Sequence, residues 1–127
     1  DVETEKLTWT SVTKMIHEAG EEYEPSVKEG LEFYVEGKSR DLVSDRFAKL
    51  LNKGESFDVE AEIITVNGLR KWVRSIGKAE YHLGNVVRAV GIFQDITEKI
   101  NQIQELEKAK QMLESIFNEL NDVIWSV

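Results

Sequence analysis

The chain has 127 residues, 41% of them hydrophobic and 31% charged, which suits one domain with a single core and a well-solvated surface. It has no cysteine, so disulfides, thiolate catalysis and cysteine metal sites are excluded. The formal net charge of −8 repels a polyanion on average and disfavours nucleic acid as a partner.

Hydrophobic runs in the sequence are short. None approaches the ~20 residues that cross a bilayer, and no segment has the pattern of a signal peptide. We therefore expect a cytoplasmic chain, although a parent protein that contains it could still be associated with a membrane.

The first third of the chain predicts a strand and two short helices. Residues 6–10 have the composition of a strand, and residues 11–20 have apolar positions at helical spacing. A second helix is predicted to begin near Ser26, because Ser26 and Glu29 have the spacing of a capping box.

A third helix is the clearest element before the strands. Ser39 is predicted to cap it and Gly54 to end it. Its apolar residues form one stripe: Leu42, Val43, Phe47, Leu50 and Leu51.

After Gly54 the apolar period changes to two. Residues 57–63 alternate as a strand does, and Asn67-Gly68 is a strong signal for a two-residue hairpin turn. Two further strands are predicted, at residues 69–81 and 86–94. Three consecutive antiparallel strands make a meander.

From Thr97 to about Leu120 the composition is helical, and Asp95 or Thr97 is the predicted N-cap. A heptad-like seam runs along this helix: Leu106, Ala109, Leu113, Ile116, Leu120 and Val123. Ile100 and Ile103 lie upstream in a shifted register. A helix this long and polar needs a partner, either a second copy or the sheet.

The order of these elements, with a set of ordered residues, resembles the PAS domain family over roughly residues 7–100. More narrowly, it resembles the subclass that ends in a PAC-type motif, here the segment GIFQDITE. The positions that carry the resemblance are Gly54, Phe57, Glu60, Gly68, Trp72, Val73, Arg74, Gly77, Gly91, Gln94, Asp95, Ile96, Thr97 and Glu98.

The resemblance implies an α+β fold: a five-stranded antiparallel sheet with short helices on one face, then a long C-terminal signalling helix. It divides the chain into a PAS domain at residues 1–97 with a truncated first strand, and a helix at residues 98–121. Residues 122–127 look like the start of a following PAS repeat. We hypothesise that residues 123–127 supply the missing strand, in the same chain or by exchange with a second copy.

The resemblance also assigns the faces of the sheet. Candidates for a ligand pocket on the helix-covered face are Phe47, Leu50, Val73, Ser75, Ala89, Gly91 and Phe93. The alternative is that these side chains fill a solid core. An outer apolar face, covered by the long helix or by a dimer mate, comprises Trp72, Val90 and Ile92, with Leu106, Leu113, Ile116 and Leu120 of that helix. Signal relay is assigned to Gln94, Asp95, Ile96 and Thr97.

Catalytic and metal-binding residues are not expected. His17 and His82 are both predicted at the surface, and although His17 is the only candidate for a haem ligand, haem is not expected. Flavin-adduct photochemistry needs a cysteine, which the chain lacks. No nucleophile and base lie in a recognisable arrangement, so the chain is expected not to be an enzyme.

The sequence therefore favours a sensory module that detects a small molecule or a partner and relays it through the C-terminal helix. The resemblance implies an output domain such as a histidine kinase or a diguanylate cyclase, and a homodimer as the assembly. A ligand-free dimerisation domain with a filled core is the alternative.

Overall fold

A computed structural model describes residues 7–125, with side chains described through residue 120. The chain forms two compact units, Asp1–Ile96 and Thr97–Val127, which divide one residue before the boundary predicted from the sequence. The elements in chain order are α1 (Ser11–Ile16), α2 (Val27–Glu32), α3 (Lys38–Lys53), β1 (Phe57–Ile64), β2 (Arg70–His82), β3 (Asn85–Asp95) and α4 (Thr97–Trp125).

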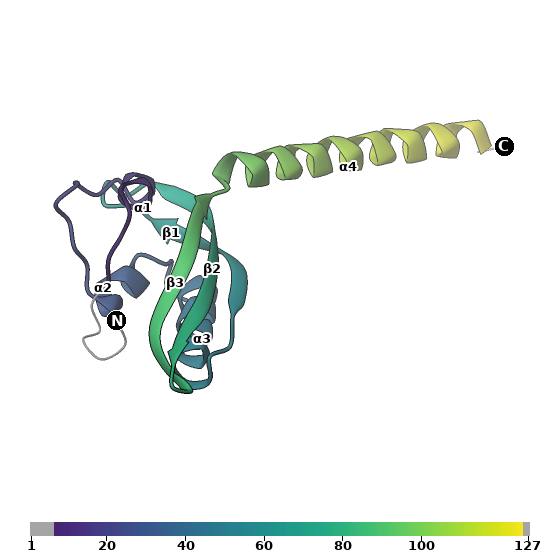
Figure 1. Ribbon diagram of the computed structural model, residues 1–127. Helices are drawn as coiled ribbons and strands as arrows, with labels where there is room; N and C mark the ends of the chain where they lie inside the picture. The colour runs from purple at the N-terminus through teal and green to yellow at the C-terminus, as the bar shows by residue number, and fades with distance from the viewer. Residues whose placement is uncertain (1–6, 126–127) are drawn as a thin grey trace. The chain divides into compact units, whose positions relative to one another are not determined.

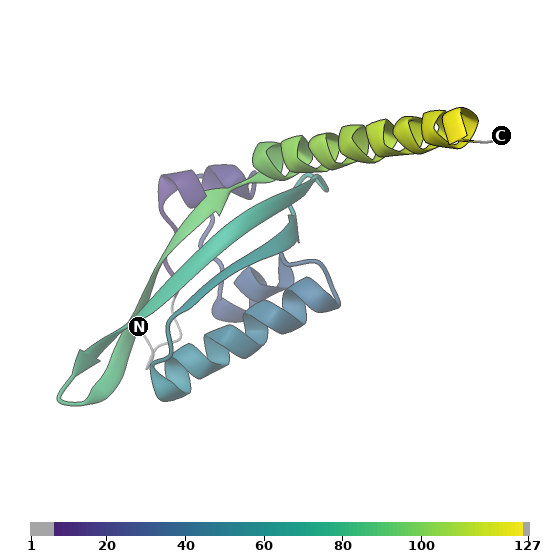
Figure 2. The ribbon, with the colours of Figure 1, turned by 90° about the vertical axis from the view of Figure 1, so that its right-hand side faces the viewer.

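The first unit is built on an antiparallel meander in the order β1-β2-β3, with α1, α2 and α3 on one face (Figures 1 and 2). The chain turns at Asn67-Gly68 as predicted, and Gly68 has a φ of 84° with its N–H donating to the Thr65 carbonyl. The turn is not the predicted two-residue hairpin, because Thr65 N–H donates to the Leu69 carbonyl and three residues lie between that pair. Glycine suits position 68 because it adopts positive φ without steric cost. The α+β class inferred from the sequence is thereby confirmed.

The predicted count of five strands is not reached in the part of the chain that the structure describes, where the sheet has three. Residues 7–10, predicted as part of a strand, have no regular structure. Trp9 instead stacks its ring on His17, so side-chain packing rather than a backbone ladder holds this segment. The outer edge of β1 is partly paired, since Val35 N–H donates to the Glu62 carbonyl.

Helix α1 is shorter than predicted. It ends at Ile16 rather than near Gly20, and Glu18 follows in a left-handed conformation with φ of 57°. The Glu18 carboxylate accepts hydrogen bonds from the Thr65 hydroxyl and the Asn67 amide in the β1–β2 turn. These long-range bonds hold a conformation that the local helical pattern does not anticipate.

The caps of α2 and α3 follow the sequence at two of three places. Ser26 Oγ accepts from Glu29 N–H at 3.1 Å, as predicted for α2. Gly54 ends α3 with a φ of 70°, also as predicted. Ser39 does not cap α3, because Gly37 precedes the first turn and Ser39 Oγ instead accepts from Glu62 N–H at 3.0 Å. Ser39 thus fastens α3 to β1.

The core lies between the helices and the inner face of the sheet. Its buried residues are Ile16, Tyr34, Val43, Ala61, Ile63 and Val73, and Leu50 of α3 is also buried. Directly opposed residues of an antiparallel pair share a face. The pairs Ala61↔Val73 and Ser75↔Phe93 therefore point toward the helices.

The second unit is a single helix of 29 residues, α4. It continues through Trp125, so the strand predicted at residues 123–127 is wrong for residues 123–125, while Ser126 and Val127 lie outside the described residues. No proline or glycine stands between Thr97 and Trp125 to end the helix. That residues 122–127 begin another repeat stays a prediction. Between residues 7 and 125, no helix combines the length and apolarity that crossing a membrane requires.

Candidate functional site

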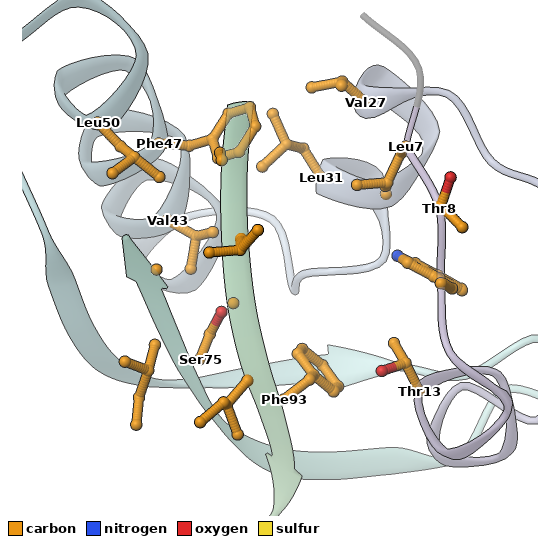
Figure 3. Close-up of a pocket in the computed structure, with 18 of the residues that line it drawn as sticks. Leu7, Thr8, Thr13, Val27, Leu31, Val43, Phe47, Leu50, Ser75 and Phe93 are labelled. Carbon is orange, nitrogen blue, oxygen red and sulfur yellow. The ribbon is translucent and has the colours of Figure 1, made fainter. Parts of the chain in front are cut away.

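A cavity of about 340 Å³ lies between the inner face of the sheet and the helices (Figure 3). Phe47 and Leu50 reach it from α3, Leu31 from α2, and Phe93 from β3. The volume falls at the lower end of the range of about 300–1,000 Å³ that is typical of small-molecule pockets. The core is therefore not completely filled between the third helix and the sheet.

Six of the seven predicted pocket residues line this cavity: Phe47, Leu50, Ser75, Ala89, Gly91 and Phe93. The seventh, Val73, is fully buried in the core and is not part of the lining. The register explains why the four strand residues meet, because Ser75 pairs with Phe93, Gly77 with Gly91 and Ala79 with Ala89.

The predicted outer face is only partly separate from the cavity. Trp72 pairs with Glu62 and is half-buried, while Ile92 is 65% exposed. Val90 and Ile92 also contribute to the cavity lining, since β3 is the edge strand on that side.

His17 is not at the surface, and that prediction is wrong. The residue is only 1% exposed, and its ring lies in an aromatic stack, with ring centroids 4.0 Å from Trp9 and 4.8 Å from Phe93. Nδ1 hydrogen-bonds the Thr13 carbonyl at 2.8 Å. Burial lowers the pKa of His17 from its usual value, and the nearby Lys71 charge lowers it further. His82 is exposed, as predicted.

A sequence signal for this burial was present but weak. Thr13 and His17 are four residues apart and so share one face of the predicted helix. The apolar residues of the predicted helix pointed elsewhere, and Val12 and Met15 are in fact exposed.

Tyr34 and Ser75 contribute hydroxyl groups to the lining of the cavity. The pKa of the Tyr34 phenol is raised because burial penalises its charged form. The two residues thus present neutral hydroxyl groups to the cavity.

The predicted relay residues lie around the end of β3. Gln94 and Asp95 are exposed, Ile96 is buried with its N–H donating to the Trp72 carbonyl at 2.9 Å, and Thr97 begins α4. Lys71, which the sequence analysis did not single out, lies beside them.

Lys71 joins two parts of the first unit. Its Nζ donates to the Ile16 carbonyl at the end of α1 at 2.9 Å and lies 3.8 Å from an Asp95 carboxylate oxygen. The residue after Ile16 is the cavity-lining His17. Lys71 therefore contacts both the helix that carries a cavity residue and the residue that ends the sheet.

Among the side chains that the structure describes, no three His, Asp or Glu residues gather where they could hold a metal ion.

No protein-family model and no curated protein matches the chain. Among solved structures, it is similar to a sensory box histidine kinase/response regulator from Burkholderia thailandensis, with a TM-score of 0.65 and 23% identity over 89% of this chain and 85% of that one. It is also similar to a PAS domain from Colwellia psychrerythraea, with a TM-score of 0.59 and 20% identity over 72% and 77% of the two chains. A light-oxygen-voltage domain, studied with a flavin analogue, has a TM-score of 0.55 and 14% identity over 80% and 75%.

Proposed function

Because the chain has the fold of PAS domains, we propose that it is a sensory module that binds a small molecule in the cavity and relays this event through α4 to an output domain. The cavity beside Phe47 and Phe93 is the observation that carries the proposal. A histidine kinase or a diguanylate cyclase is the output we favour, and the name of the similar Burkholderia protein supports the former. Catalysis then belongs to the output domain, and this chain regulates it.

The ligand can be sought by native mass spectrometry of freshly purified protein, where a retained small molecule adds mass to the folded chain. We expect Ala89→Phe to abolish this extra mass, because Ala89 lines the cavity and the added ring would occupy it. Val87→Phe is the matched control, since Val87 is exposed on the same strand and outside the lining. A bare mass for the wild type, even after incubation with metabolite extracts, would favour the ligand-free dimerisation domain.

For the relay, we propose that Lys71 couples α1 to the end of β3. A ligand that shifts His17 would move the carbonyl of the preceding residue, Ile16, and with it the partner of Lys71. The same ammonium group faces Asp95, two residues before α4, so the shift reaches the start of that helix along the chain.

Lys71→Met is expected to uncouple α1 from the end of β3, because it removes the ammonium group while keeping the length of the side chain. Adding toluene as a cavity probe should move the backbone amide resonances of residues 95–100 in the wild type and leave them nearly unmoved in the variant. Lys78→Met, on an exposed position of the same strand, is the control. Shifts of equal size in all three proteins would argue against the relay.

We propose that the assembly is a homodimer formed along α4. Exposed apolar residues recur there at coiled-coil spacing: Leu106, Leu113, Ile116 and Leu120. Leu113→Glu is expected to turn a dimer into a monomer in sedimentation equilibrium, and Gln111→Glu, an exposed site off this seam, to leave it a dimer. A wild type that stays monomeric at high concentration would exclude this assembly.

A further inference from the structure

A stack of three rings from three different segments lines part of the cavity. The His17 ring lies nearly parallel to Trp9 and to Phe93, with interplanar angles of 23° and 24°. Because an aromatic ring covers each face of the imidazole, only its edge is available to a molecule in the cavity. Phe33 packs edge-on against the same ring at 4.9 Å.

The edge of His17 has one nitrogen left for a ligand. Nδ1 is engaged by the Thr13 carbonyl, which can only accept, so Nδ1 carries the proton. Nε2 of a neutral ring is then a hydrogen-bond acceptor. The lowered pKa favours this neutral form, since burial and the Lys71 ammonium both disfavour a second proton.

The remaining polar side chains of the described lining differ from Nε2, which can only accept. They are hydroxyl groups, which donate as well as accept, and the Trp9 indole N–H and the Arg88 guanidinium, which only donate. Arg88 is the one charged side chain among the described lining residues, and it is largely exposed, with its guanidinium 3.8 Å from the Glu80 carboxylate. A ligand anion would therefore lose its hydration without meeting a buried cation.

Aromatic side chains make up much of the rest of the cavity lining. Phe47, Phe57 and Phe93 line the cavity, and aromatic rings pack well against such surfaces in offset or edge-to-face geometry. A volume of about 340 Å³ suits a small ring system. Resting on the proposed function, we infer that the cavity selects an uncharged aromatic ligand of the indole or phenol type, whose single N–H or O–H donates to His17 Nε2.

Four probes distinguish the inferred hydrogen bond to His17 from the broader proposal that the cavity binds a small molecule. Toluene tests whether the cavity admits an aromatic ring at all, and indole adds a donor. The compound 1-methylindole removes that donor with little change in shape, and benzoate adds a negative charge. Dissociation constants come from NMR titrations of the wild type, His17→Phe and His82→Phe. Phenylalanine at position 17 keeps a ring in the stack but removes the acceptor, and His82 is the exposed control.

We expect toluene to bind all three proteins. Indole should bind about 10-fold more tightly than 1-methylindole to the wild type and to His82→Phe, because a buried acceptor left unpaired is costly. In His17→Phe the two indoles should bind equally. Benzoate should bind most weakly. As a check that needs no variant, the ¹⁵N resonance of His17 Nε2 in the wild type should move on addition of indole and not of 1-methylindole.

Other outcomes overturn specific claims. Equal binding of the two indoles to the wild type, with a stationary Nε2 resonance, would refute the role of His17 while leaving a ligand cavity in place. Tighter binding of benzoate than of indole would refute the choice of an uncharged ligand. Failure of toluene to bind would refute an aromatic ligand, whereas the ligand-binding function itself is decided by the retained mass in native mass spectrometry.

Discussion

Replacing Ile63 by alanine is expected to lower the free energy of unfolding by about 2–5 kcal/mol, as is usual for the truncation of a large core side chain. Ile63 is fully buried on the inner face of β1 and belongs to the same cluster as Ile16, Tyr34 and Val43. It joins the helices to the sheet, and the Tyr34 backbone bridges to it. The loss combines the transfer of the side chain with the cavity left behind.

Ile64 provides a matched control, because it has the same side chain on the same strand and the opposite face. It is 39% exposed, and its N–H donates to the Phe33 carbonyl, a backbone bond that alanine keeps. Ile64→Ala should cost under about 1 kcal/mol, in line with substitutions near the surface. Urea titration followed by circular dichroism measures both. Losses of equal size would mean that the core is not where the structure places it.

The structural features that could be predicted from the sequence are those that depend on only a few neighbouring residues. Asn67-Gly68 marks a turn and Gly54 a helix end because glycine alone adopts those conformations cheaply, and neither depends on distant contacts. Strand alternation likewise placed Ser75 and Phe93 on one face, since the side-chain period of a strand is two.

The features that sequence reasoning missed are all made by distant residues. His17 is buried because Trp9 and Phe93 cover it, and Phe93 comes from the last strand of the sheet. Helix α1 stops early because Glu18 bonds the turn after β1. Ser39 Oγ accepts a hydrogen bond from the Glu62 N–H instead of capping α3 as predicted. In each case a long-range contact overrides a local preference, and a single sequence does not record such contacts.

The residues of the candidate site likewise fall into those that could be predicted from the sequence and those that could not. Four of the six cavity residues lie on strands and could be named because resemblance to a family supplied the faces of the sheet, while Phe47 and Leu50 belong to the apolar stripe of α3. Lys71 could not, since its importance arises only when α1 folds against β2 and brings the Ile16 carbonyl to it. The polar character of the cavity was missed for the same reason, as His17 enters it from a short helix far away in the sequence.

Gly91→Ala is expected to destabilise the first unit by about 1–3 kcal/mol, which is typical of overpacking. Gly91 pairs with Gly77 on the inner face, at the cavity. A Cβ at Gly91 would lie 2.5 Å from the Ile76 carbonyl oxygen. That oxygen belongs to the backbone of β2, so no side-chain rotation can relieve the contact, and the two strands would have to move apart.

Gly20→Ala separates this steric effect from the general effect of losing a glycine. Nothing lies within 4 Å of a Cβ at Gly20, and its φ is not in the left-handed region. Removing glycine at a compatible position stabilises by about 0.4–1 kcal/mol through the unfolded chain. Urea unfolding should therefore give changes of opposite sign for the two variants. If Gly91→Ala were as stable as Gly20→Ala, β2 and β3 would not approach closely at Gly91, and the floor of the cavity would tolerate side chains that the structure excludes.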